Sequence, residues 1–169
     1  TPAIPHDNNQ LVFFQKNCYQ IMKRAELLGM ISKDYFTIAI AGTHGKTSTC
    51  TMLSHVLKNS GVNCTAFLGG ISRNYNTNLI YSEKSDVFII EADEYDRSFH
   101  CLEPDIALIT SIDIDHTDIY SDYENLVSSF QIFTSNINTG GVIFLEENYQ
   151  SNYEGFDPNN AESVIGLTL

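Results

Sequence analysis

A glycine-rich loop that contains a lysine lies between an apolar stretch and a helix-compatible stretch of this 169-residue chain. The apolar stretch, FTIAIA at 36–41, is typical of a buried strand. Glycines allow the tight turn in which successive N–H groups point at one anion, and the positive end of the following helix adds to the attraction. The pattern therefore predicts a phosphate-binding loop. Its residues are Gly42, Thr43, His44, Gly45, Lys46, Thr47 and Ser48.

Within this loop, Lys46 and Thr47 have the residue types that contact nucleotide phosphates and their metal ion. The lysine would bridge the β- and γ-phosphates, and the threonine hydroxyl would bind Mg²⁺. The spacing is shorter than the common Gly-x-x-x-x-Gly-Lys-Ser/Thr form, because position 40 is Ile. A structural turn with a solvated lysine is the competing interpretation, and the strand and helix on either side favour the phosphate loop.

An acidic segment, Glu-Ala-Asp-Glu-Tyr-Asp, begins directly after the apolar run at 87–90. In a fold of parallel strands, a carboxylate at such a strand end faces the phosphate loop, and its oxygens suit Mg²⁺. Mg²⁺ takes only one or two protein carboxylates, so the acids of this segment cannot all be ligands. Glu91, which comes first, is the predicted metal ligand and catalytic residue. Asp93 and Glu94 are equally consistent with supporting or surface positions.

A third group, Asp115 and His116, follows the apolar stretch at 106–110. The carboxyl ends of parallel strands converge on one crevice, so His116 would reach the same metal as Glu91 through a neutral ring nitrogen. A lone histidine in such a place is more often structural. Its convergence with the loop and with Glu91 favours the interpretation as a metal ligand with a catalytic role.

The elements that position these residues alternate between strand and helix. Gly61 is placed to end the first long helix, and Asp122 to cap the start of a later one. Near-continuous apolar strands that alternate with helices are typical of a parallel sheet covered on both faces. The sequence therefore predicts an α/β fold. Strands are predicted at 36–41, 64–70, 87–90, 106–110 and 142–145, and helices at about 46–59 and 122–133.

The two ends of the chain differ from this pattern. Residues 1–33 contain one predicted helix, at about 11–30, and are interpreted as a connector into a phosphate-loop domain at 34–169. The last stretch is polar and turn-rich, and it becomes apolar just before an abrupt end. We therefore expect the chain to be a piece of a longer protein, cut within the phosphate-loop domain.

Composition and charge exclude several classes of protein. The net charge is −12, whereas a nucleic-acid-binding surface is basic. The sequence has neither an apolar run of the roughly eighteen residues that a membrane span needs nor a secretory signal, so we expect a cytoplasmic protein. Residues 1–84 have eight basic and four acidic side chains, and residues 85–169 have one and seventeen. This division is consistent with phosphate binding in the first part and cation binding in the second, and equally with a solvated acidic surface.

Taken together, the three motifs resemble those of a known family. The stretches AGTHGKTST and EADEYDRSFHCLEPDIALITSIDIDHTDIY look like the central domain of the Mur ligases, which build the peptide of bacterial peptidoglycan. The resemblance covers about residues 20–145. A histidine at position 44 resembles both the L-alanine-adding branch and the murein-peptide recycling branch, and EADEYD occurs in the recycling branch. The RSFHxLxP and DHxDIY patterns, and the lack of any lysine after Lys84, look more like the L-alanine-adding branch.

The resemblance implies an ATP- and Mg²⁺-dependent ligase that joins the carboxylate of UDP-N-acetylmuramate to L-alanine through an acyl phosphate. It implies that Lys46 contacts the phosphates, that Thr47 and Glu91 hold Mg²⁺, and that His116 binds a shared or second Mg²⁺. The UDP-sugar substrate would approach Gly70, Ser72 and Arg73.

The resemblance also implies partners and leaves alternatives open. Family members have an N-terminal domain that binds the UDP group and a C-terminal domain that supplies the amino-acid site, so this chain alone would be inactive. The first alternative is the recycling ligase, which attaches a tripeptide to UDP-N-acetylmuramate. The second, of another class, is a nucleotide-binding module without catalysis, against which the presence of Lys46, Glu91 and His116 argues.

Overall fold

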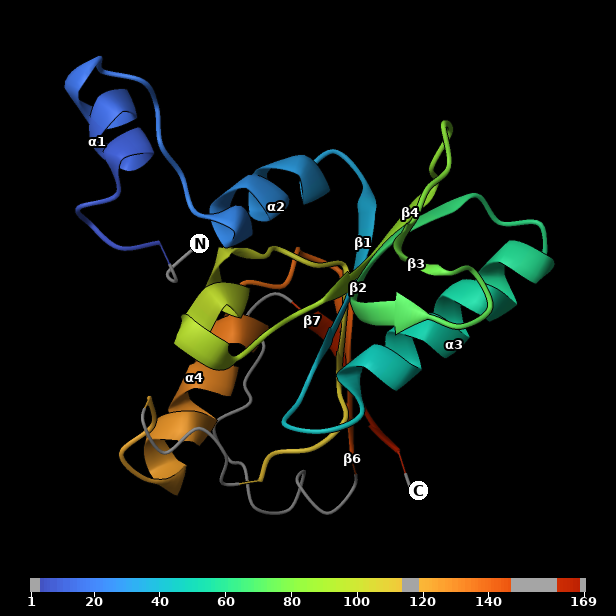
Figure 1. Cartoon of the computed structure of the whole chain (residues 1–169). Helices are drawn as coiled ribbons and strands as arrows, with labels where there is room; N and C mark the ends of the chain where they lie inside the picture. Colours follow the sequence, from blue (N-terminus) through green and yellow to red (C-terminus); the bar gives the residue numbers. More distant parts are fainter. Residues whose placement is uncertain (1–3, 114–118, 147–160, 168–169) are drawn as a thin grey trace.

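The computed structural model of the chain describes residues 4–113, 119–146 and 161–167. Within these ranges, seven strands form one sheet in the order β3-β2-β4-β1-β5-β6-β7 (Figure 1). Neighbouring strands are parallel, except that β2 and β3 pair antiparallel. The predicted α/β class is confirmed. The strands are β1 (Phe36–Ala41), β2 (Cys64–Ser72), β3 (Thr77–Ile80), β4 (Val87–Glu91), β5 (Ile106–Ile109), β6 (Gly141–Glu146) and β7 (Ala161–Leu167).

Helices cover both faces of the sheet (Figure 1). On one face, Cys50 and Leu53 of α3 pack against a cluster that includes Ile40 of β1. On the other face, Leu28 of α2 and Phe130 of α4 belong to the second and larger apolar cluster, together with residues of the 3-10 helix η1. These elements are α2 (Arg24–Ser32), α3 (Lys46–Asn59), η1 (Tyr95–Cys101) and α4 (Tyr123–Ser135).

Local signals in the sequence set the ends of two helices. α3 ends at Asn59, and Gly61 follows with φ 83°, the left-handed conformation that favours glycine just after a helix. α4 begins at Tyr123, and the Asp122 carboxylate accepts the backbone N–H of Asn125 at 2.8 Å. Both predicted helix ends are therefore confirmed.

The single helix predicted at about 11–30 is wrong, because the structure has α1 (Asn9–Lys16) and α2 with a break between them. The Asn17 side-chain amide donates to the Phe13 carbonyl at 2.8 Å. Cys18 then has φ 57°, which a right-handed α-helix does not contain. A side chain that bonds to the backbone competes with helix continuation, and apolar periodicity does not reveal this competition.

Three elements were absent from the predicted pattern. β3 and η1 are short, and β3 lies in the polar segment TNLI, which becomes a strand by pairing with β2. β7 follows a polar stretch and pairs in parallel with β6. The first of these pairings also gives the sheet an antiparallel edge, which the prediction of a parallel sheet did not include.

The N-terminal helices differ in their packing. Leu28 of α2 lies in the larger apolar cluster, and Gly29 packs against the backbone of Cys101 in η1. Every residue of α1 is at least partly exposed, and Figure 1 shows α1 apart from the sheet. The division into a connector at 1–33 and a domain at 34–169 stays a prediction. Among the described residues, no helix is both long enough and apolar enough to span a membrane.

Candidate functional site

The predicted phosphate loop, residues 42–48, connects the carboxyl end of β1 to the start of α3. Gly42 has φ 128° and Gly45 has φ 83°, and side chains rarely tolerate either conformation. A Cβ on Gly42 would also collide with the Thr110 hydroxyl. Gly45 is the N-cap of α3 and has no side chain to accept from the first N–H groups of the helix. These N–H groups are a ready anion-binding site.

The end of β5 holds the loop in this shape. The Thr43 N–H donates to the Ser111 carbonyl at 3.0 Å, and the hydroxyls of the two residues lie 2.9 Å apart. The Ser111 hydroxyl also accepts the His44 N–H at 3.0 Å. Thr43 is buried, whereas His44 is exposed. Thr43 therefore anchors the loop, and sequence analysis missed Ser111, although a polar residue just beyond a neighbouring strand is a usable signal.

The Lys46 side chain contacts the backbone of its own loop and Glu94, the residue just before η1. Its Nζ donates to the Gly42 carbonyl at 2.6 Å and to the two carboxylate oxygens of Glu94 at 2.8 and 3.0 Å. The Lys46 side chain is 12% exposed and that of Glu94 is 0% exposed. Sequence analysis left Glu94 between a supporting and a surface position, and the structure makes it the buried counter-ion of the loop lysine.

Thr47 contacts Glu91 directly through its side chain. Its hydroxyl lies 2.8 and 2.9 Å from the carboxylate oxygens of Glu91. The Gly69 N–H of β2 donates to the same carboxylate at 2.6 Å. Parallel pairing explains the meeting, because Glu91 of β4 is the register partner of Ile40 in β1, just before the loop.

One thiol lies behind the loop. Cys50, one turn into α3, is 0% exposed. Burial raises the pKa of its thiol, the nearby Glu91 carboxylate raises it further, and Lys46 opposes this rise. A thiol in such a place stays protonated, so Cys50 fills space beneath the loop and is not a nucleophile.

Comparison with known proteins identifies the family. The model of the Mur ligase middle domain matches residues 40–167, which contain the loop, Glu91 and the strands around them. The chain belongs to the Mur ligase middle-domain family. The resemblance found in the sequence motifs is thereby confirmed.

A curated relative supports the same assignment of the Mur ligase middle domain. The UDP-N-acetylmuramate–L-alanine ligase of Porphyromonas gingivalis is 54% identical over 146 residues, which are 86% of this chain and 32% of the relative. The chain thus spans about a third of the length of the curated relatives it matches.

Solved structures have the same fold. The UDP-N-acetylmuramate–alanine ligase of Thermotoga maritima is 26% identical with a TM-score of 0.75, over 99% of this chain and 38% of that one. The UDP-N-acetylmuramate:L-alanyl-γ-D-glutamyl-meso-diaminopimelate ligase of Neisseria meningitides is 23% identical with a TM-score of 0.83, over 96% and 56%. The latter likeness shows the fold alone.

The oxygen atoms at the loop of this Mur ligase middle domain fit a magnesium ion. Thr47 and Glu91 offer hydroxyl and carboxylate oxygens, the hard ligands that Mg²⁺ takes, together with several waters. In the ranges that the structure describes, no group of three or more His, Cys, Asp or Glu side chains gathers as a metal site.

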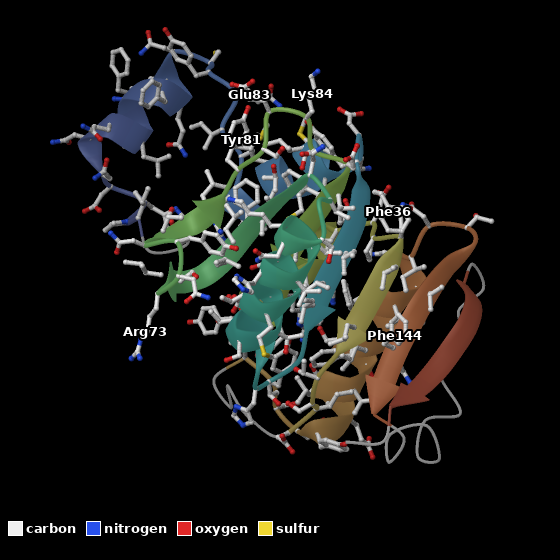
Figure 2. All side chains as sticks on the ribbon, turned by 90° about the vertical axis from the view of Figure 1, so that its right-hand side faces the viewer. Phe36, Arg73, Tyr81, Glu83, Lys84 and Phe144 are labelled. Carbon is white, nitrogen blue, oxygen red and sulfur yellow. The ribbon has the colours of Figure 1, made fainter. Side chains whose placement is uncertain are left out.

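The remaining predicted site residues are the metal ligand His116 and the three substrate-binding residues of β2 and the turn after it. His116 and Asp115 lie outside the described residues, so the role of His116 stays a prediction. Gly70 is partly exposed and next to the Thr47 side chain, whereas Ser72 is 4% exposed. Figure 2 shows Arg73 extending outward at the β2–β3 hairpin. The assignment of these three residues to a sugar-nucleotide substrate stays a prediction.

Proposed function

We propose that this chain is the ATP-binding part of a ligase that joins L-alanine to the carboxylate of UDP-N-acetylmuramate. The observation that carries the proposal is the phosphate loop with Lys46 at its centre and with the Thr47 hydroxyl against Glu91, in a chain 54% identical to a ligase of that name. ATP would transfer its γ-phosphoryl group to the carboxylate and leave as ADP. The amine of the amino acid would then attack the acyl phosphate, forming the amide and releasing phosphate. We also propose a cytoplasmic location, where ATP is available.

Each loop residue has a proposed part in this reaction. The glycines and the first N–H groups of α3 bind phosphate oxygens, and Lys46 neutralises charge on the transferred group. Thr47 and Glu91 hold Mg²⁺, and His116 completes the metal site. Gly70, Ser72 and Arg73 lie along the path of the UDP-sugar. The UDP-binding and amino-acid-binding domains are supplied by parts of the protein outside this chain.

The test is phosphate release by the full-length protein that contains this chain, given ATP, Mg²⁺, UDP-N-acetylmuramate and L-alanine. Lys46→Ala is expected to lower the rate by at least about a hundredfold, the usual cost of losing one group that stabilises charge in the transition state. Lys84→Ala is the matched control. Lys84 is exposed and precedes Val87, which pairs with Phe36 at the opposite edge of the sheet (Figure 2). Equal rates for the two variants would contradict the roles assigned to the loop.

The amine donor distinguishes two candidate functions. The recycling reaction stays the second candidate, because His44 and the EADEYD motif also resemble that branch of the family. Phosphate release with L-alanine supports the first, and release only with the tripeptide L-alanyl-γ-D-glutamyl-diaminopimelate supports the second. Release with neither amine would indicate a nucleotide-binding module without catalysis.

A further inference from the structure

Tyr120 is a buried tyrosine whose hydroxyl contacts the turn between β4 and η1. The residue is 3% exposed, and its hydroxyl donates to the backbone carbonyl of Glu94 at 2.6 Å. Glu94 is the residue just before η1, and its carboxylate oxygens lie 2.8 and 3.0 Å from Nζ of Lys46. Tyr120 therefore bonds to the backbone of a residue whose side chain contacts the phosphate-loop lysine.

The Tyr120 hydroxyl is itself fixed by Ser129 of α4. A backbone carbonyl can only accept a hydrogen bond, so the proton of the Tyr120 hydroxyl goes to Glu94. The Ser129 hydroxyl lies 3.2 Å from the Tyr120 oxygen and must therefore be the donor in that contact. Ser129 is also 3% exposed, so bulk water has little access to either hydroxyl.

His100 of η1 adds a further hydrogen bond to this pair. Its Nε2 lies 2.9 Å from the Ser129 hydroxyl oxygen and 3.0 Å from the Ser129 carbonyl oxygen. The Ser129 hydroxyl proton is used on Tyr120 and a carbonyl has no proton, so both contacts require a proton on Nε2. The hydrogen bonds thus run in one direction, from His100 through Ser129 and Tyr120 to the carbonyl of Glu94.

This directed chain of hydrogen bonds anchors the turn that carries Glu94. A buried chain in which every group has a partner restrains its members more strongly than one exposed bond does. Arg97 adds two contacts, because its N–H also donates to the Glu94 carbonyl at 3.0 Å and its guanidinium lies 5.7 Å over the Tyr120 ring. η1 and α4 lie side by side (Figure 1), and both contribute to the larger apolar cluster. The backbone of Glu94 is therefore tied to a packed part of the molecule.

We propose that Tyr120 is a positioning residue for Lys46, which holds Glu94 and thereby places the lysine ammonium for the transfer of a phosphoryl group. The proposal rests on the proposed function, since it concerns the same loop and the same reaction. The glycines and the first N–H groups of α3 bind phosphate without help from Tyr120. Its effect should therefore appear in kcat, where the charge of the transition state is stabilised, and little in the KM for ATP.

The experiment measures phosphate release by the full-length protein with ATP, Mg²⁺, UDP-N-acetylmuramate and the amine that the parent accepts. Tyr120→Phe keeps the ring and removes only the hydroxyl. We expect kcat to fall roughly tenfold, less than the hundredfold that a misplacement of about 1 Å can cost. In a Lys46→Ala background the same substitution should leave kcat unchanged, because the lysine through which Tyr120 acts is then absent.

Thr37→Val is the matched control for the loss of a buried hydroxyl. Thr37 is 0% exposed, and its hydroxyl donates to the Ser32 carbonyl at 2.9 Å. It lies near the start of β1, whereas the phosphate loop follows the end of that strand. Thr37→Val should lower the Tm, because a buried hydrogen bond is lost, and should leave kcat unchanged.

Two further variants make the result decisive. Ser129→Ala breaks the chain one step further from Glu94, so it should lower kcat less than Tyr120→Phe does, and again only when Lys46 is present. If Lys46→Ala does not fold, as judged by circular dichroism, Lys46→Met combined with Glu94→Gln replaces it as the background, since the buried carboxylate charge is then removed as well.

The outcomes separate this proposal from the proposed function. A fall in kcat that requires Lys46 supports the proposal. If Tyr120→Phe lowers kcat by the same factor with and without Lys46, the hydroxyl acts elsewhere and the proposal is wrong. Unchanged kcat in Tyr120→Phe, with Lys46→Ala still strongly impaired, would also overturn it and leave the proposed function intact. A parent that releases no phosphate with L-alanine or with the tripeptide would overturn both, since Lys46 would have no transfer to assist.

Discussion

The Thr47 hydroxyl lies 2.8 and 2.9 Å from the two carboxylate oxygens of Glu91, which ties the first turn of α3 to the last residue of β4. The Gly69 N–H of β2 donates to the same carboxylate at 2.6 Å. Contacts from two separate elements, α3 and β2, hold this one side chain of β4. A carboxylate held in this way is pre-positioned, which is what the proposed magnesium site, with few protein ligands, requires.

Gly69→Ala is predicted to displace Glu91 and to weaken the proposed magnesium site. A Cβ on Gly69 would lie 2.5 Å from both carboxylate oxygens of Glu91, closer than such atoms approach. The carboxylate would have to move, because it is the flexible partner. We expect the Mg²⁺ concentration needed for half-maximal ADP binding to rise by roughly tenfold, the lower end of the losses seen when a group that orients a metal ligand is removed.

Gly70→Ala is the matched control for this prediction. A Cβ on Gly70 would meet the Thr47 side chain at 3.5 Å, an ordinary van der Waals distance, and would leave Glu91 in place. We expect it to leave the Mg²⁺ dependence of ADP binding close to that of the parent. Equal Mg²⁺ dependence in the two variants and the parent would show that Gly69 does not support Glu91.

Lys46→Met is predicted to lower the free energy of unfolding by about 3–5 kcal/mol, the cost of removing one member of a buried ion pair. The reason is that Glu94 is 0% exposed. The double variant with Glu94→Gln should recover most of this loss, because the buried carboxylate charge is then removed as well.

The exposed pair provides the comparison for Lys46→Met. Lys33 and Glu103 are 50% and 48% exposed, so Lys33→Met should cost no more than about 1 kcal/mol. Urea denaturation of the four proteins measures these differences. A loss for Lys46→Met no larger than that for Lys33→Met would contradict the assigned burial of the ion pair.

Asp122 is predicted to stabilise α4 in a pH-dependent manner. The hydrogen bond from the Asn125 backbone N–H lowers the pKa of the Asp122 carboxyl, and a hydrogen bond from the Ser121 hydroxyl lowers it further. Since the folded pKa is the lower one, the contribution is fully present above the unfolded aspartate pKa of about 3.9. It is lost as the pH falls through the folded pKa. The difference in Tm between the parent and Asp122→Ala should therefore be constant near neutral pH and shrink at acid pH.

Asp122→Asn separates the effect of the carboxylate charge from the effect of the hydrogen bond at the N-cap. Asparagine is also a good N-cap, so this variant should keep most of the stability at neutral pH. The difference in Tm between Asp122→Asn and Asp122→Ala should change little as the pH falls, because asparagine does not titrate. A Tm difference between the parent and Asp122→Ala that persists unchanged down to about pH 2, well below the ordinary aspartate pKa, would contradict the ionised cap.

Cys50 is predicted to resist thiol reagents in the folded protein. It is 0% exposed. Burial raises the pKa of its thiol, and the Glu91 carboxylate raises this pKa further. Cys18 is exposed and serves as the internal control. Iodoacetamide labelling at pH 8, followed by mass mapping, should modify Cys18 first and Cys50 only after denaturation. Labelling of Cys50 as fast as that of Cys18 would contradict its position beneath the loop.

Part of the candidate site could be predicted because its signals are local. The strand at 36–41, the glycine-rich loop and the helix that begins at Lys46 follow one another without interruption, and the loop needs all three. The approach of Glu91 to Thr47 followed from a general property of parallel sheets, whose strands end at one edge. The class of fold was predictable for the same reason, since apolar strands and helices alternate along the chain.

The rest depended on contacts between distant segments. Sequence reasoning could not choose between Asp93 and Glu94, because both follow the same strand and only the turn into η1 decides which of them is buried. Glu94 lies beneath the loop and Asp93 is exposed. The break after α1 was missed for a different, local reason, because the Asn17 side chain bonds to the Phe13 carbonyl and apolar periodicity does not show such a bond.

The sequence by itself thus determined the position of the glycine-rich loop, the α/β class and the family, because residue type, spacing and local periodicity carry that information. Only the tertiary structure decided the partner of Lys46, which lies 48 positions further along the chain. A buried ion pair forms when strand pairing brings two segments together and excludes water from both. No local pattern encodes that exclusion.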